Sequence, residues 1–241
     1  MKKNYFYLAV ILIFSSLFAQ EKPNIVINEI LTSNKSGMKN PSTNSYDDWF
    51  ELYNSGDDAV NLMGFYLSDD LNKKDKWQIS SNITIQAKGF YGFWADDLDY
   101  SNHTNFKLAQ SFEQLVFSSP QQGIIDSVSY AEQYVDISFG RYPDGSAEFF
   151  YFLKPSPGKI NDSTRYTSIA EAPQCDFESG FYGQSIIVKL SAPDSLKIHY
   201  SLDGSIPTQD HPQFSEYIYI SETTVLRARC FSDNSLPSRI I

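Results

Sequence analysis

Short apolar stretches alternate with polar turn residues along most of the chain. Within a stretch, apolar or aromatic side chains tend to occupy every second position, and Gly, Asn, Asp, Ser or Pro follows. A period of two is that of a strand with one buried face, and no helix-length 3.6-residue repeat competes with it. The pattern predicts strands at residues 24–31, 49–54, 64–68, 75–79, 89–94, 114–118 and 124–130. Short, regularly spaced strands of this kind predict a β-sandwich or barrel.

A second set of strands follows a polar interruption. The aromatic strand 149–152 ends at Lys154-Pro155-Ser156-Pro157-Gly158, and residues 161–173 contain few side chains fit for a core. Such a segment is typical of a linker between domains. New strands are predicted at residues 185–191, 197–202, 217–221 and 224–231. We therefore expect two domains, at residues 24–161 and 173–241, with a linker at residues 162–172.

The first residues predict export. Lys2 and Lys3 precede an uncharged apolar run at residues 5–14, and a small-residue end follows at Ala19. The run is shorter than the roughly 20 residues of a membrane-spanning helix, which favours a cleaved signal peptide at residues 1–19 over an uncleaved N-terminal anchor. No later stretch is long and apolar enough to span a membrane. We therefore expect a secreted or cell-surface protein with no membrane span in the mature chain.

The chain is acidic, with 19 Lys and Arg against 29 Asp and Glu and a net charge of −10. Loss of Lys2 and Lys3 with the signal peptide would make it more acidic still. Binding to nucleic acid or to an anionic membrane needs clustered cations. The densest group of cations, at residues 73–76, contains Asp75 and has the character of a solvated loop. We therefore expect no nucleic-acid partner.

The two cysteines, Cys175 and Cys230, both lie in the second predicted domain. In an oxidising compartment they are candidates for a disulfide, which would help a domain of about 70 residues whose core is small. Their spacing is not the CxxC of zinc or redox sites. Two buried free thiols are the alternative, because the sequence does not give the Cα separation that a disulfide requires.

Several motifs of the first predicted domain follow one another over nearly all of residues 24–161. They are Ile25-Val26-Ile27-Asn28-Glu29-Ile30, Asp48-Trp49-Phe50-Glu51-Leu52-Tyr53-Asn54, the run at residues 60–70, Lys76-Trp77-Gln78-Ile79, Asn105-Phe106-Lys107-Leu108, the run at residues 138–145 and Pro155-Ser156-Pro157-Gly158. Each motif is weak alone, but their order and spacing together resemble the bacterial lamin-tail domain. The resemblance implies an immunoglobulin-like β-sandwich that serves as an interaction module and performs no chemistry.

The second predicted domain carries its own motifs. They are Gly180-Phe181-Tyr182, the run Tyr200-Ser201-Leu202-Asp203-Gly204-Ser205-Ile206-Pro207-Thr208 and the run at residues 223–229. They resemble the chitobiase and β-hexosaminidase C-terminal domain, a small sandwich that accompanies a catalytic domain and does not itself hydrolyse sugar. The fold class implied is all-β, with two consecutive β-sandwiches after the signal peptide: one immunoglobulin-like, then a smaller fibronectin- or immunoglobulin-like one.

The two modules in this order resemble the front of larger exported bacterial proteins, including spore-coat-kinase-like ones. Residues 232–239 have the character of a turn before a final strand, yet only Ile240 and Ile241 follow. A strand usually has about five residues, so we expect the second sandwich to be truncated at its last strand. We therefore expect the chain to be the N-terminal part of a larger protein.

Catalytic chemistry finds little support in the sequence. The histidines His103, His199 and His211 do not lie in HExxH, in a close pair or beside a GxSxG motif. No phosphate-binding or dinucleotide motif occurs either. We therefore expect no enzyme activity, no cofactor and no catalytic, cofactor-binding or metal residues. An enzyme would need two or more of the histidines and acids within hydrogen-bond reach.

Pairs of aspartates at predicted strand ends allow one metal hypothesis. They are Asp47-Asp48, Asp57-Asp58, Asp69-Asp70 and Asp96-Asp97 with Asp99. Carboxylate oxygens are ligands for Ca²⁺, but adjacent acids cannot all face one ion, and a calcium loop spaces its ligands more regularly. Solvated, solubilising turns are the preferred interpretation.

The tryptophans allow a carbohydrate hypothesis. Trp49, Trp77 and Trp94 could offer flat faces to a sugar, although large rings in sandwiches more often fill the space between the sheets. Alternation places Trp49 and Glu51 on one face of a strand and Phe50 on the other, without saying which face is buried.

Three functional classes follow. The leading one is a structural or adhesive pair of modules that contacts a protein or a cell-surface polymer. The second is a carbohydrate- or cell-wall-binding appendage of an extracellular enzyme or a spore-coat-kinase-like protein, which would show a row of exposed Trp or Tyr. An enzyme is the third.

Overall fold

The computed structural model describes residues 22–241, and it confirms the all-β prediction. These residues form strands β1 to β19 and a short 3₁₀ helix, η1 (Leu71–Lys73). The predicted signal peptide at residues 1–19 lies outside the described residues. No helix in the described part of the chain is long and apolar enough to cross a membrane.

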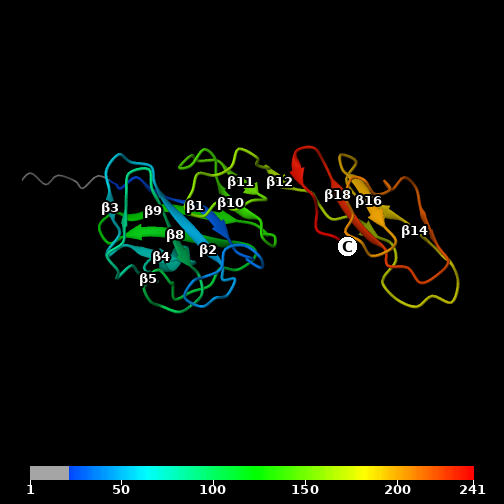
Figure 1. Ribbon diagram of the computed structural model, residues 1–241, viewed down its shortest axis with the longest axis horizontal. Helices are drawn as coiled ribbons and strands as arrows, with labels where there is room; N and C mark the ends of the chain where they lie inside the picture. Colours follow the sequence, from blue (N-terminus) through cyan, green and yellow to red (C-terminus); the bar gives the residue numbers. More distant parts are fainter. Residues whose placement is uncertain (1–21) are drawn as a thin grey trace, which may run out of the picture.

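Two antiparallel sheets make up the first sandwich (Figure 1). The five-stranded sheet has the order β11-β10-β1-β2-β7, with strands β1 (Ile25–Leu31), β2 (Trp49–Asn54), β7 (Phe90–Trp94), β10 (Ser138–Arg141) and β11 (Phe149–Phe152). The four-stranded sheet has the order β5-β4-β8-β9, with strands β4 (Tyr66–Ser68), β5 (Trp77–Gln78), β8 (Glu113–Ser119) and β9 (Gly123–Tyr130). The short strands β3 (Val60–Asn61) and β6 (Thr84–Ile85) pair beside them.

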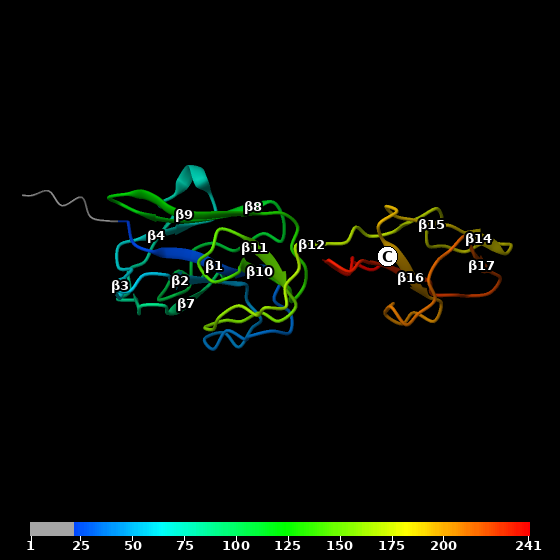
Figure 2. The same ribbon diagram turned by 90° about the horizontal axis from the view of Figure 1, so that it is seen from above.

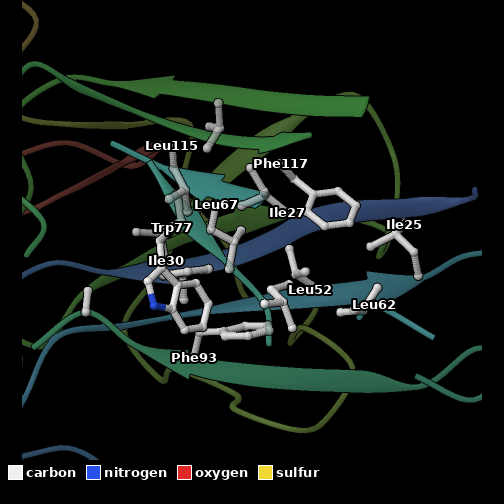
Figure 3. Close-up of a cluster of buried hydrophobic side chains, with 14 of the residues drawn as sticks. Ile25, Ile27, Ile30, Leu52, Leu62, Leu67, Trp77, Phe93, Leu115 and Phe117 are labelled. Carbon is white, nitrogen blue, oxygen red and sulfur yellow. The ribbon is translucent and has the colours of Figure 1, made fainter. Parts of the chain in front are cut away.

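The main core lies between these two sheets, as Figure 3 shows. Ile27 and Phe50 enter it from the five-stranded sheet, and Leu67 and Phe117 enter it from the four-stranded sheet. Strand alternation accounts for this arrangement, because residues two apart share a face. Phe50 and Leu52 therefore define the face of β2 that points into this core, which the sequence left open.

Most of the predicted strands of the first domain are confirmed, some within one residue of the expected bounds. The predicted strand at residues 75–79 is shorter in the structure, where β5 covers only Trp77–Gln78. The prediction missed β3, β6 and β10. Strand β10 escaped notice because Ser138 and Gly140 interrupt its apolar pattern, although it pairs with both β1 and β11.

The predicted linker at residues 162–172 is bonded at both ends. Tyr166 exchanges two backbone hydrogen bonds with Tyr151 of β11, at 2.9 and 3.0 Å. The guanidinium of Arg165 lies over the ring of Tyr142, 4.0 Å from its centroid. Farther along, β12 (Ser168–Ile169) pairs in parallel with β19 (Ser235–Leu236) of the second domain. Backbone hydrogen bonds therefore tie Tyr166 to the first domain, and Ser168, Ile169 and Ala170 to the second.

The second domain consists of short two-stranded ladders. They pair β13 (Gln174–Cys175) with β15 (Leu190–Ser191), β14 (Ile186–Val188) with β17 (Ile218–Ile220), and β16 (Lys197–Ser201) with β18 (Arg227–Phe231). Val188, Ile198 and Cys230 belong to their common core. Ile241 exchanges backbone hydrogen bonds with Ala228 of β18, so the last described residue lies along this ladder. Figure 2 shows the two domains side by side along the long axis, with β12 between them.

Candidate functional site

The three tryptophans are buried, which corrects the hypothesis that they form a sugar-binding surface. Their exposed fractions are 1% for Trp49, 4% for Trp77 and 6% for Trp94. Trp77 lies in the main core and donates its indole N–H to Asp99 at 2.9 Å. Trp49 and Trp94 are opposite one another on the outer face of the five-stranded sheet and pack with Leu31. Loops cover Trp49 and Trp94 on this face, and the two sheets enclose Trp77, so none of the three rings is available for stacking.

The predicted aspartate pairs mostly organise turns. Asp70 caps η1 by accepting the backbone N–H of Asn72, and Asp69 forms an ion pair with Lys76 at 2.6 Å. Asp48 accepts the backbone N–H of Asn34. Within residues 22–241, no three His, Cys, Asp or Glu side chains come together in a way that could hold a metal ion. Asp48 and Asp70 therefore act as backbone acceptors in turns, a common role of Asp, while Asp69 serves as an ion-pair partner.

His103 lies in a buried polar cluster on the outer face of the first sandwich. Its Nδ1 is 2.5 Å from Oδ2 of Asp96, and its Nε2 is 3.3 Å from Oγ of Ser42. The order Ser42, His103, Asp96 is that of a nucleophile, a base and an orienting acid. However, the Tyr100 ring stacks on the imidazole at 4.3 Å, His103 is 1% exposed, and Asn40 also donates to Asp96. We interpret the cluster as a clamp that fixes the loop at residues 40–47.

The other two histidines have local structural roles. The Nδ1 of His199 is 2.8 Å from the carbonyl oxygen of His211. The ring of His211 accepts the backbone N–H of Thr208 at 3.1 Å and lies 3.1 Å from Oγ of Ser205. These contacts fix the Ser205–Thr208 part of the motif that resembles the chitobiase C-terminal domain.

Cys175 and Cys230 are free thiols in the structure. Cys230 lies inside the second core, and Cys175 packs against that core while half-buried. Burial, with a smaller contribution from the charge of Glu171, raises the pKa of the Cys230 thiol to about 11. Of the two alternatives that the sequence left open, this arrangement is the one with unbridged thiols, since both side chains fill apolar space.

A pair of buried glutamates is the main feature that sequence reasoning missed. Glu29 of β1 lies directly opposite Glu51 of β2 on the outer face of the five-stranded sheet, and both are fully buried. A bulge between Ile27 and Glu29 shifts the register. Without this bulge, Glu29 would point with Ile27 into the main core, because residues two apart share a face. The glycines of the adjacent strands flank the pair: Gly140 lies opposite Glu29, and Gly92 lies opposite Glu51.

The segment at residues 155–161, called here the strap, covers these two acids. Ser156 donates its backbone N–H to Glu29 at 3.1 Å, and Gly158 donates its backbone N–H to Glu51. The hydroxyl of Ser156 lies 2.7 Å from Oδ1 of Asn161 and 3.1 Å from Glu29, so its one proton is shared between these acceptors. Ser138 of β10 also donates to Glu29, at 2.5 Å. The Oε1 atom of Glu51 has no hydrogen-bond partner within the described residues.

The Pro157-Gly158 sequence explains how the strap reaches the acids. Lys159 donates its backbone N–H to the carbonyl of Ser156, which closes a turn with Pro157 and Gly158 at its centre. Gly158 has a φ of 75°, which glycine adopts without strain, and proline followed by such a glycine is typical of a type II turn. Asn161 ends the strap by donating its amide to the carbonyl of Arg141 at 2.7 Å.

Burial changes the acidity of both glutamates. It raises the pKa of Glu29 to about 7 against the hydrogen bonds from Ser138 and Ser156, which favour the charged form. Burial, with a smaller contribution from the neighbouring charges of Glu29 and Asp144, raises the pKa of Glu51 to about 8. Two carboxyl groups in a desolvated place resist ionising together. The pair therefore keeps a proton near neutral pH.

Exposed aromatic side chains gather instead on the second domain. Tyr217 and Tyr219 flank the buried Ile218, so both point to the outer face of the β14–β17 ladder. Ile187 lies directly opposite Tyr219 on this face. The exposed fractions are 53% for Ile187, 56% for Tyr217 and 60% for Tyr219. We call these three residues the tyrosine face.

Comparison with known families identifies two segments of the chain. Residues 19–132 match the Lamin Tail Domain, and residues 177–241 match the Chitobiase/beta-hexosaminidase C-terminal domain. The order of the two matches is the one that the sequence motifs predict. Comparison with curated proteins and with solved structures found no match. Both matched segments are similar to immunoglobulin-like structural or binding domains, and neither match is to a catalytic domain.

Proposed function

The chain carries a lamin tail domain followed by a chitobiase/β-hexosaminidase C-terminal domain. We propose that it is an exported, non-catalytic pair of modules that attaches to a cell surface. In this proposal the first sandwich is a rigid scaffold and the second domain makes the contact. The partner is a protein or a polymer at the cell surface.

The tyrosine face is the observation that supports this division of roles. Exposed apolar side chains that lie together mark binding surfaces more often than scattered ones do, and tyrosine is enriched at interfaces. Tyr217, Tyr219 and Ile187 meet this description. On the first sandwich, by contrast, the outer face of the five-stranded sheet is occupied by its own loops and strap.

A cell-binding assay tests the proposal. The labelled full chain is expected to bind intact cells, and the double variant Tyr217→Ser with Tyr219→Ser should reduce this binding at least about tenfold, because aromatic anchors dominate such contacts. Tyr46→Ser is the matched control, since Tyr46 is a partly exposed tyrosine of the first domain. Equal binding of the double variant and the control would contradict the proposal.

Treatment of the cells separates the two kinds of partner. Binding that disappears after surface proteins are digested indicates a protein partner. Binding that persists on purified cell-wall polymer or on insoluble chitin indicates the carbohydrate alternative, which the exposed tyrosine rings favour because flat rings stack on sugars. In either case, the binding must be lost in the Tyr217→Ser, Tyr219→Ser double variant if the tyrosine face is the contact surface.

Export is part of the same proposal and rests on Lys2, Lys3 and the apolar run at residues 5–14. Expression in a bacterial host should give a mature protein that begins near Gln20, as determined by N-terminal mass analysis. A soluble cytoplasmic form that retains Met1 would contradict this localisation.

The non-catalytic part of the proposal has its own test at Ser42. A fluorophosphonate probe, which labels activated serines, should not label Ser42 above the level of a Ser42→Ala variant. Labelling that depends on both Ser42 and His103 would show that the cluster with Asp96 activates a nucleophile and would overturn this part.

A further inference from the structure

Glu29 and Glu51 are arranged so that together they can hold one negative charge but not two. Two residues directly opposite in an antiparallel pair have Cβ atoms about 4.5–5.5 Å apart. Three donor groups converge on the carboxyl groups: the hydroxyl of Ser138, the backbone N–H of Ser156 and the backbone N–H of Gly158. The hydroxyl of Ser156 lies 3.1 Å from Glu29 but is closer to Oδ1 of Asn161, at 2.7 Å, and it has only one proton to donate. These donors suit a single negative charge. The side chain of Asn28 also favours the charged form of Glu51, but Oε1 of Glu51 has no hydrogen-bond partner within the described residues.

The charged groups around the pair offer no compensation for a second negative charge. Asp144, in the turn after β10, adds a negative charge close enough to disfavour ionisation of both glutamates. The guanidinium of Arg141 is directed to Asp126 and to the backbone carbonyls of Ile27 and Ser146. Lys154 and Lys159 are exposed to solvent. Within the described residues, no cation forms an ion pair with either glutamate.

We propose that Glu29 and Glu51 share one proton and act as a latch that keeps the strap closed on the sheet, and that loss of this proton opens the strap. Opening admits water to the two charges. The strap lies just before Arg165 and Tyr166, which attach the interdomain segment to the first sandwich. The latch therefore controls the part of the chain that leads from the first domain to the second. This inference is independent of the tyrosine face.

Proteolysis at a site inside the strap reports its opening. Trypsin cleaves after lysine, and Lys159 is exposed within the strap. In the full chain, cleavage after Lys159 is measured by mass spectrometry between pH 6.5 and 9.5. Cleavage after the exposed Lys73 and Lys74 near η1, in the same digest, corrects for the pH dependence of trypsin itself. The ratio of cleavage after Lys159 to cleavage after Lys73 and Lys74 should rise roughly tenfold above pH 8. A tenfold change is the factor that corresponds to one pKa unit of coupling between the two glutamates.

Glu51→Gln should make this ratio independent of pH, because Glu29 alone can ionise within its set of donors. Glu148→Gln is the matched control, because Glu148 is an exposed glutamate in the turn before β11 and should keep the pH dependence of the natural chain. A ratio that stays constant with pH in the natural chain would overturn the latch. A cleavage ratio that rises with pH as much in Glu51→Gln as in the natural chain would also overturn the latch.

A titration of the natural chain keeps the test decisive if Glu51→Gln fails to fold. Carbon-13 NMR of the side-chain carboxyl groups should show two glutamates that lose their protons in separate steps near and above neutral pH. If all glutamates of the folded chain titrate together near the ordinary pKa of about 4.3, the shared proton does not exist.

Discussion

Arg141 of β10 donates two hydrogen bonds to the carboxylate of Asp126 on β9, at 3.0 and 3.1 Å, and so joins the two sheets of the first sandwich. Asp126 also accepts the backbone N–H of Ile27 at 2.7 Å, and Arg141 donates to the carbonyl of the same residue. Both side chains are largely buried. The ion pair therefore fixes β1, β9 and β10 relative to one another.

Removal of one member of this pair should destabilise the first domain. Asp126→Asn leaves the Arg141 charge buried without its partner, and we expect a loss of about 3 kcal/mol in the free energy of unfolding. Asp57→Asn is the control, because Asp57 pairs with Lys88 at the surface, where an ion pair contributes less than about 1 kcal/mol. Urea unfolding of the full chain measures both. Similar effects of the two substitutions would show that the buried pair does not stabilise the sandwich.

The two glycines beside the glutamates should respond differently to alanine. A Cβ at Gly140 would lie 2.8 Å from the carbonyl oxygen of Asn28 and 3.2 Å from Cγ of Glu29. A Cβ at Gly92 would meet only the carbonyl oxygen of Phe50, at 4.0 Å. We expect Gly140→Ala to cost about 1–3 kcal/mol and Gly92→Ala to be tolerated. Thermal unfolding of the two variants checks this, and an equal loss in both would contradict the close packing around Glu29.

The stability of the first domain should fall as the pH rises through the neutral range. Burial raises the pKa of Glu29 to about 7 and that of Glu51 to about 8, so the folded state holds protons that the unfolded chain releases. The stabilisation is complete below the unfolded pKa of about 4.3 and is lost as the pH passes through these raised values. Denaturant unfolding at pH 5, 7 and 9 measures the change.

The double variant Glu29→Gln with Glu51→Gln should remove most of this pH dependence, because neither amide titrates. It should also lower stability at pH 5, where two protonated acids are well tolerated and Gln introduces donors without acceptors. A loss of stability between pH 5 and 9 that is as large in the double variant as in the natural chain would assign the pH dependence to other groups.

The two thiols of the second domain should differ in reactivity. Because burial raises the pKa of Cys230 to about 11, its thiol stays protonated at neutral pH, and the core shields it from reagents. In the folded chain, iodoacetamide at pH 7.5 should modify Cys175 before Cys230, as measured by peptide mass spectrometry. Denatured protein, in which both should react, is the control. A disulfide between the two, found without reducing agent, would contradict the unbridged arrangement.

Local pattern determined the strands and the order of the two domains. Alternation identified β1, β2 and β7 almost to the residue, because period-two burial is a property of the strand itself. The ordered motifs predicted both family matches. Strand β10 lay beyond local reasoning, because Ser138 and Gly140 face the strap and not an apolar core.

Only the tertiary structure decided which faces were buried and which acids met. The sequence places Trp49 and Glu51 on one face of a strand, but it does not show that loops cover this outer face and bury both residues. The bulge in β1 turns Glu29 to the same face, and the pairing of β1 with β2 sets it opposite Glu51. Pairing joins residues that are distant in the chain, so no local period reports it. For the same reason the aromatic surface appeared at Tyr217 and Tyr219, and not at the three tryptophans that composition first indicated.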